Sequence, residues 1–444
     1  MLLRAPILPT LLRLAGPNVL VMLAQACTGL IETAFIGRLG VGALAGVAVV
    51  FPGFMLMQMM SGGAMGGAIS AAIARALGGG KRAEAEALAV HALVINGLLG
   101  LCFTLLGLFA GPVLYRAMGA QGATLEAALR YSDVLFSGAI VLWLFNGLAS
   151  CIRGTGNMLV PAGVIVGGAV LLVPLSPCLI FGLGPFPALG VTGGGLAMLA
   201  YYAVGGLILL RYLRGPHSLV RLRRVRLHAA PLWTILRVGL VASLVSVQTQ
   251  IIVTLFTAYV APFGPGAMAG YGTGARLEYM LIPLVFGFGA PLVALVGTNL
   301  GAGQPERALR AAWTGATLAF ATTEAIGLVA AVWPGAWLHL FGDDPSMIEA
   351  GSAYLRDVAP FYGAFGFGMA LYFASQGAGR MIWPLAAAVL RMGVAVGGGW
   401  LALRLGFGLH TVFLALSAGI VAMAAVNAAA VGMGAWFAGP RRMG

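Results

Sequence analysis

Long uninterrupted apolar runs dominate the chain. They occupy residues 17–37, 44–75, 87–112, 133–153, 159–182, 189–212, 236–260, 277–298, 311–336, 355–376, 382–404 and 411–437. A helix needs about 20 apolar residues to cross a bilayer, and lipid leaves only helices or closed barrels as spanning structures. Because the runs are continuous and do not alternate with polar residues, the pattern predicts an all-α polytopic membrane protein with twelve transmembrane helices.

Composition narrows the class of protein further. The chain has 444 residues, of which 60% are hydrophobic and only 8% are charged. Twelve spans use most of this length, so no segment remains for a soluble catalytic domain. The net charge of +13 does not indicate nucleic-acid binding, because the basic residues gather in alternate loops. This bias predicts that both termini are cytoplasmic.

Short motifs recur in the two halves of the chain at a nearly constant offset. "IRGTGNMLVP" at 152–161 matches "SQGAGRMIWP" at 375–384, and "GALAG" at 42–46 matches "GAMAG" at 266–270. An even number of spans in each half keeps both halves in the same orientation. We therefore expect two pseudo-symmetric six-helix lobes around a central cavity: an N-lobe (1–212), a basic cytoplasmic linker (213–235) and a C-lobe (236–444).

One carboxylate interrupts the first apolar run, in "LIETAFIGRLG" at residues 30–40. A charge at bilayer depth is costly, so Glu32 is read by default as functional. Gln25, Thr28 and Glu32 are spaced to share one helix face. Two interpretations stay open: Glu32 is a structural group that is protonated or salt-bridged, or it exchanges a proton for a cationic substrate.

Other polar, sulfur-containing and aromatic side chains are candidates for lining a substrate cavity. Methionine adapts to varied apolar ligands, and aromatic rings attract organic cations. Packing between helices is the alternative role for each of them. With Gln25 and Thr28, the cavity candidates are Met55, Met59, Gln250, Thr254, Tyr362 and Phe365.

Three further ionisable residues lie at or near membrane depth. Glu324 and Arg391 fall inside the predicted ninth and eleventh helices, and we expect them to neutralise each other or to pair with nearby backbone. Glu278 would begin the eighth helix near the outer mouth, where it could attract cations or simply be an interfacial glutamate.

Several longer stretches resemble a known transporter family. These are "GLIETAFIGRLGVGALAGVA", "RGTGNMLVP", "IFGLGPFPALGVTGGGLA" and "AGYGTGARLEYMLIPLVFGFGAPLVALVGTNLGAGQPERA". They are similar to the multidrug and toxic compound extrusion (MATE) family, and within it to the DinF-like branch. The resemblance implies secondary active efflux of cationic amphipathic drugs in exchange for protons or sodium.

The resemblance also assigns residue roles. Proton-coupled members carry an Asp in helix one, fifteen residues after a proline that bends the helix, and Pro17 and Glu32 have that spacing here. The family's helix-five Asn and Asp fall on Leu172 and Ser176, so a second N-lobe carboxylate is missing. Acidic residues of the sodium-coupled branch would fall near Thr249 and Phe365, which carry no charge. We therefore expect protons to be the coupling ion in preference to sodium, with no other cofactor and no bound metal.

Three functions are compared at this stage. The leading prediction is a proton-coupled multidrug antiporter in the bacterial inner membrane, acting as a monomer on small organic cations. The second is a flippase for lipid-linked precursors in the same superfamily, which the lack of an intramembrane arginine cluster disfavours. The third, a membrane-embedded enzyme, is disfavoured because the sequence has no HExxH motif and no nucleophile elbow.

Overall fold

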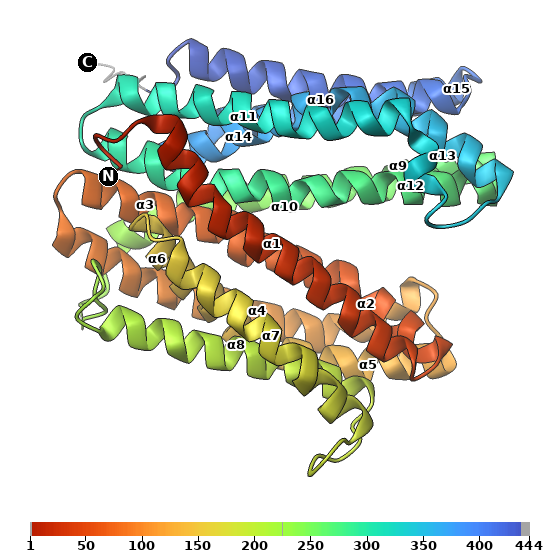
Figure 1. Ribbon diagram of the computed structural model, residues 1–444, viewed down its shortest axis with the longest axis horizontal. Coiled ribbons are helices and arrows are strands. Elements are labelled where there is room, and N and C mark those ends of the chain that lie inside the picture. Colours follow the sequence, from red (N-terminus) through yellow and green to blue (C-terminus); the bar gives the residue numbers. More distant parts are fainter. Residues whose placement is uncertain (1, 224, 437–444) are drawn as a thin grey trace. The chain divides into compact units, whose positions relative to one another are not determined.

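The computed structural model describes residues 2–223 and 225–436, and these form helices joined by turns and short loops, with no β-strand among them (Figure 1). Within this part of the chain, eleven helices are long and apolar enough to cross a membrane, or twelve if one bent helix pair counts as a single span. The prediction of an all-α polytopic membrane protein is confirmed.

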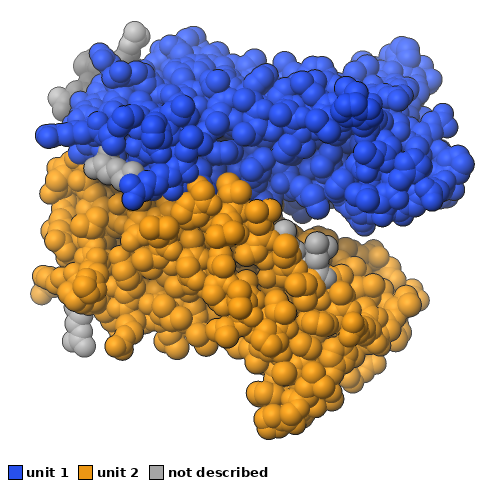
Figure 2. All heavy atoms as spheres, viewed as in Figure 1, with its two compact units in different colours: residues 1–15, 240–444 blue, residues 16–239 orange. Residues whose placement is uncertain are grey.

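The chain divides into two compact units, coloured separately in Figure 2. Unit 2 contains residues 16–239, and unit 1 contains residues 1–15 together with 240–444. The expected linker 213–235 lies inside unit 2, and the first fifteen residues belong with the C-terminal half. Both passages between the units occur within helices, in α1 (Ile7–Gly37) and in α9 (Ala229–Val260).

Unit 2 consists of the greater part of α1, the start of α9 and the helices between them. These are α2 (Val41–Gln58), η1 (Met59–Met65), α3 (Gly66–Gly78), α4 (Arg82–Ala117), α5 (Gly122–Ser137), α6 (Ala139–Gly154), α7 (Leu159–Phe181) and α8 (Val191–Arg214). In η1 the backbone is π-helical, so α2, η1 and α3 form one long span with a widened turn in its middle.

The fourth predicted span, 133–153, is a bent pair in the structure. α5 and α6 meet at an angle of 48° next to Gly138. The apolar pattern misses the first half of α5 because Glu126 and Arg130 interrupt it. A Cβ atom at Gly138 would lie 2.2 Å from a terminal methyl group of Leu199 in α8, so any larger residue at the bend would require the Leu199 side chain to move.

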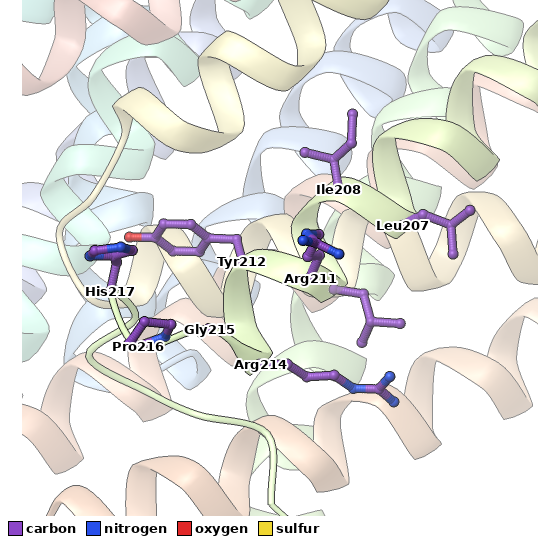
Figure 3. Close-up of a pocket in the computed structure, with 9 residues that line it drawn as sticks. Leu207, Ile208, Arg211, Tyr212, Arg214, Gly215, Pro216 and His217 are labelled. Carbon is purple, nitrogen blue, oxygen red and sulfur yellow. The ribbon is translucent and has the colours of Figure 1, made fainter.

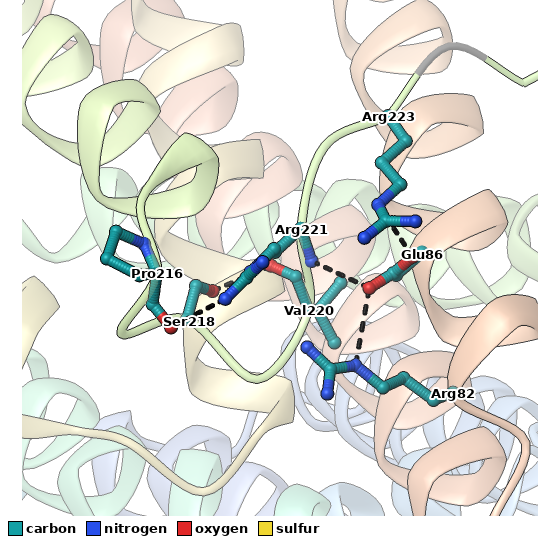
Figure 4. Close-up of polar contacts among 7 residues, drawn as sticks. All are labelled: Arg82, Glu86, Pro216, Ser218, Val220, Arg221 and Arg223. Atoms are coloured by element: carbon teal, nitrogen blue, oxygen red, sulfur yellow. Dashed lines mark hydrogen bonds and ion pairs between the residues drawn. The ribbon is translucent and has the colours of Figure 1, made fainter.

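The segment between α8 and α9, residues 215–228, folds back onto the start of α4 (Figure 4). Glu86 of α4 accepts from the backbone N–H of Arg221 at 3.4 Å, and its carboxylate lies 3.8 Å from Nε of Arg223. His91 Nε2 accepts from the backbone N–H of His228 at 2.9 Å. The described part of the segment is therefore anchored to α4 at Arg221, Arg223 and His228.

Unit 1 contains the remaining helices. These are η2 (Ala261–Phe263), α10 (Pro265–Gly301), α11 (Pro305–Val332), α12 (Pro334–Leu338), α13 (Pro345–Val358), η3 (Ala359–Phe361), α14 (Tyr362–Ala378), α15 (Ile382–Arg404) and α16 (Leu409–Gly432). Small side chains, mainly alanines of α11 and α14, fill a core that also receives Leu11 of α1. Small residues at such contacts let membrane helices approach closely.

Candidate functional site

Glu32 is buried within unit 2, with 6% of its surface exposed. Its Oε1 atom has no hydrogen-bond partner among the described residues, and Glu32 takes part in none of the ion pairs found there. Gly194 of α8 faces the same oxygen, since a Cβ atom at this glycine would lie 3.5 Å from it. Tyr131 of α5 and Tyr202 of α8 lie within its electrostatic reach. The side chain is thus a buried carboxyl without a fixed counter-charge.

A chain of hydrogen bonds runs beside the π-helical turn of the same unit. Gln58 donates from Nε2 to the hydroxyl of Tyr202 at 2.6 Å, and accepts at Oε1 from Nδ2 of Asn146 at 3.1 Å. Asn146 also donates to Ser61 Oγ at 2.9 Å. Through Tyr202 this polar network extends from α6 toward the surroundings of Glu32. Buried networks of this kind fix side-chain orientation when their members are paired.

The other candidates on the first two helices occupy different environments. Gln25 is exposed, and the Thr28 hydroxyl donates to the Ala24 carbonyl of its own helix at 2.7 Å. Met55 and Met59 are half-buried, and Met59 opens η1. Pro17 lies inside α1, one residue after the passage between the two units.

A second cluster of ionisable and aromatic side chains lies inside unit 1. Glu278 Oε2 accepts a hydrogen bond of 2.6 Å from the Tyr354 hydroxyl. Glu278 Oε1 lies 3.7 Å from Nη2 of Arg391, whose guanidinium is centred 5.6 Å from the ring of Phe365. The cluster therefore joins α10, α13, α14 and α15, and Tyr362 of α14 is buried next to it.

These contacts correct one sequence-based expectation, for Glu278, and choose between the two alternatives left open for Glu324, which pairs with nearby backbone and not with Arg391. Glu278 does not begin a helix: α10 starts at Pro265, and Glu278 lies within it with a largely buried side chain. Glu324 and Arg391 do not pair with each other. Glu324 Oε2 accepts from the backbone N–H of Gly363 at 2.7 Å, while Arg391 pairs with Glu278. The position of Glu278 was misjudged because the predicted apolar run starts at 277, after the glycine-rich first turns of α10.

The polar face of α9 is largely engaged with its own backbone. Thr254 is exposed and donates to the carbonyl of Gln250 at 3.0 Å, and Gln250 itself is half-buried. Ser246 and Thr257 likewise donate to carbonyls four residues earlier. Their oxygens keep acceptor capacity, which is what a cationic ligand would use.

The sequence did not reveal the tyrosines of either site. Tyr131 and Tyr202 lie within the electrostatic reach of Glu32, and the Tyr354 hydroxyl donates to Glu278. Tyr202 lies inside a predicted apolar run, and Tyr131 and Tyr354 lie just before two others, at 133 and 355, so none of them stands out by pattern. The available signal was that a buried tyrosine hydroxyl requires a partner. No group of three or more His, Cys, Asp or Glu side chains suited to a metal ion occurs in residues 2–223 and 225–436.

Comparisons with known proteins agree with this architecture. The MatE family model matches the chain twice, at residues 17–178 and 240–401, which is the offset of the internal repeats. A FAD transporter of Shewanella oneidensis is 29% identical over 82% of this chain and 81% of its own length. The probable multidrug resistance protein NorM of Thermotoga maritima is 26% identical, covering 83% of this chain and 79% of its own.

Solved structures are similar over nearly the whole chain. A MOP superfamily transporter from Pyrococcus furiosus, described as having a binding pocket of reverse polarity, aligns with a TM-score of 0.90 at 26% identity, covering 97% of this chain and 96% of its own. An outward-facing multidrug resistance MATE family transporter aligns with a TM-score of 0.89 at 26% identity, covering 98% of each chain. The sequence match in both halves and the shared fold agree: the chain belongs to the MATE family of membrane transporters and is not an enzyme.

Proposed function

We propose that this protein is a multidrug efflux antiporter that exports cationic amphipathic compounds in exchange for protons. The observation that carries the proposal is Glu32, a buried carboxyl on α1 with no ion-pair partner among the described residues. A carboxyl in that setting binds either a proton or an organic cation. Mutually exclusive binding at one group is sufficient to couple the two fluxes.

Several further assignments belong to this proposal. We place the protein in the bacterial inner membrane as a monomer, with both termini cytoplasmic and two lobes that alternately expose a central cavity. The cavity residues proposed are Gln25, Thr28, Met55, Met59, Gln250, Thr254, Tyr362 and Phe365. The relatives named as multidrug resistance proteins support the substrate class.

The test is a proton-flux measurement in proteoliposomes, with ethidium as the organic cation, with and without sodium. We expect wild type to dissipate an imposed pH gradient on adding ethidium, and Glu32→Gln to lose this response. Glu126→Gln is the matched control, because Glu126 is an exposed carboxylate of the same unit, and its ion pair among the described residues is with Arg130.

Glu32→Asp keeps a titratable group and should retain part of the flux. Ethidium-driven proton release by Glu32→Gln at the wild-type rate would refute the coupling role, and an absolute need for sodium would refute proton coupling.

A second candidate substrate is a flavin nucleotide. One relative is named a FAD transporter, and this chain has a buried arginine, Arg391, against the ring of Phe365. Its Nε has no hydrogen-bond partner within the described part of the chain. Guanidinium and aromatic groups suit a ligand that combines phosphates with a planar ring. Loaded FAD leaving wild-type proteoliposomes, with no movement of ethidium, would favour this substrate over organic cations.

A further inference from the structure

A cavity of about 870 Å³ lies at the end of α8, where the helix gives way to the segment 215–228 (Figure 3). Its lining includes Leu207, Ile208, Arg211, Tyr212, Arg214 and His217. All of these residues belong to unit 2, and none is part of the two sites described above. The cavity combines apolar side chains, two guanidinium groups and a turn of backbone.

The apolar part of the lining continues an exposed stripe on α8. Val204, Leu207 and Ile208 have 52%, 65% and 50% of their surface exposed, as expected of side chains that face lipid in a membrane-spanning helix. Arg211 follows Leu207 by four residues and Arg214 by seven, so both lie on the same helix face. Four residues of helix rise about 6 Å. The two arginines therefore lie beyond the apolar stripe, in the last turn of α8.

The two arginines of the cavity have no acidic partner among the described residues, and other arginines nearby do. Arg82 and Arg223 both point to the carboxylate of Glu86, at 3.3 and 3.8 Å (Figure 4). Neither Arg211 nor Arg214 forms an ion pair with any described carboxylate. Two positive charges without an acidic partner among the described residues thus line an open cavity at the end of a helix long and apolar enough to cross a membrane.

The far wall of the cavity is held in place by hydrogen bonds. The backbone N–H of Leu222 donates to the carbonyl of Leu213 at 3.1 Å, and Ser218 Oγ donates to the carbonyl of Val220 at 2.6 Å. Asn157 donates to the Tyr212 hydroxyl at 3.1 Å. These bonds fix the turn, and the exposed Leu219 adds apolar surface to it.

We propose that this cavity binds the headgroup of an anionic phospholipid. Arg211 and Arg214 hold the phosphate, and the acyl chains lie along Val204, Leu207 and Ile208. Basic pockets next to transmembrane helices have the chemistry for this class of lipid, and guanidinium groups match phosphate oxygens in geometry. The site is separate from the transport function and does not depend on the identity of the exported compound.

The test is a binding titration of the delipidated full-length protein in neutral detergent, followed by native mass spectrometry. The probes are phosphatidylglycerol, phosphatidylcholine and soluble glycerol 3-phosphate. We expect saturable phosphatidylglycerol binding to wild type, with affinity reduced about tenfold or more in Arg211→Gln/Arg214→Gln. Arg38→Gln/Arg116→Gln is the matched control, because it also removes two exposed arginine charges from unit 2, at positions that do not line the cavity, and it should bind as wild type does. If the glutamine variant does not fold, Arg211→Lys/Arg214→Lys replaces it in the titration; this variant keeps both charges but loses the guanidinium geometry.

Each remaining outcome overturns the proposal. Equal binding of phosphatidylglycerol by wild type and both glutamine variants means that the arginines interact with the membrane only non-specifically. Equal binding of phosphatidylcholine removes the requirement for an anionic lipid. Glycerol 3-phosphate that displaces phosphatidylglycerol at equal concentration shows that the occupant is a free phosphate compound.

Discussion

The carboxylate of Glu278 lies 3.7 Å from the guanidinium of Arg391, although 113 residues separate them in the chain (residue 278 against 391). Their side chains are only 16% and 6% exposed. The two charges therefore compensate each other in a region from which water is largely excluded. Tyr354 adds a hydrogen bond to the carboxylate, so the acidic partner is fixed on two sides.

Removing one member of this pair should cost more stability than removing both. Glu278→Gln leaves a buried guanidinium without a counter-charge, and we expect a loss of about 3 kcal/mol in the free energy of unfolding. Glu278→Gln combined with Arg391→Met should recover most of that loss. Thermal unfolding of the purified variants measures the coupling between the two positions. Additive losses in the double variant would show that the pair contributes little.

Two adjacent glycines of α8 should respond differently to the same substitution. A Cβ atom at Gly193 would lie 2.4 Å from the Leu179 carbonyl oxygen, so Gly193→Ala must displace backbone and should destabilise by about 1–3 kcal/mol. A Cβ atom at Gly194 would meet Glu32 Oε1 at an ordinary 3.5 Å. We expect Gly194→Ala to keep wild-type stability. Melting temperatures of the two variants decide this, and equal values would show that α7 and α8 have more room than these distances imply.

The Gln58 network should depend on a single hydroxyl. Tyr202→Phe removes the oxygen to which Gln58 donates, and the unpaired buried amide should cost about 1–2 kcal/mol. Tyr201→Phe is the control, because its ring packs against the same Phe145 and its hydroxyl forms no hydrogen bond with the described residues. Denaturant or thermal unfolding of the two purified variants compares their losses in stability. If Tyr201→Phe proves as harmful as Tyr202→Phe, the loss reflects ring packing and not the hydrogen bond.

Asp344 caps the N-terminus of α13, and its contribution to the free energy of unfolding should depend on pH. Its carboxylate accepts from the Met347 N–H at 2.9 Å and from Ser346 Oγ at 2.5 Å, and these bonds hold the pKa of Asp344 below its ordinary 3.8. A lowered folded-state pKa means that the stabilisation is present above the unfolded value and is lost as pH falls through the folded value. Asp344→Ala should therefore lower the melting temperature at pH 7, with the difference shrinking below pH 3.8.

The control for this prediction is Glu349→Ala, which removes an exposed carboxylate from the same helix. It should leave the melting temperature nearly unchanged at both pH values. Asp344→Asn keeps a capping oxygen and should fall between wild type and Asp344→Ala at pH 7. A melting-temperature difference for Asp344→Ala that stays constant from pH 7 to pH 3 would contradict the assignment.

Hydropathy predicted the helices well because a membrane span is a local property of about 20 consecutive residues. The predicted span 382–404 has the same bounds as α15. The repeats that begin at 152 and 375 predicted two related halves, and the family model matches both. Hydropathy failed where charges interrupt a helix, as Glu126 and Arg130 do in α5. Glu32 stood out because a buried carboxylate is conspicuous in an apolar run. The partners of Glu278 could not be recognised from the sequence, because its contacts with Tyr354 and Arg391 join helices that are far apart in the chain.

The chain passes between its two compact units only twice, at residues 15–16 in α1 and at residues 239–240 in α9, and each passage is inside a helix. Two helices, rather than a flexible tether, form the covalent connection. Any rotation between the units would thus be taken up as bending and torsion of helical backbone. Pro17 weakens the first passage, because proline has no N–H to offer the carbonyl of Arg13. In the alternating-access cycle proposed above, the bending stiffness of these two helices would set an elastic resistance to each change of conformation.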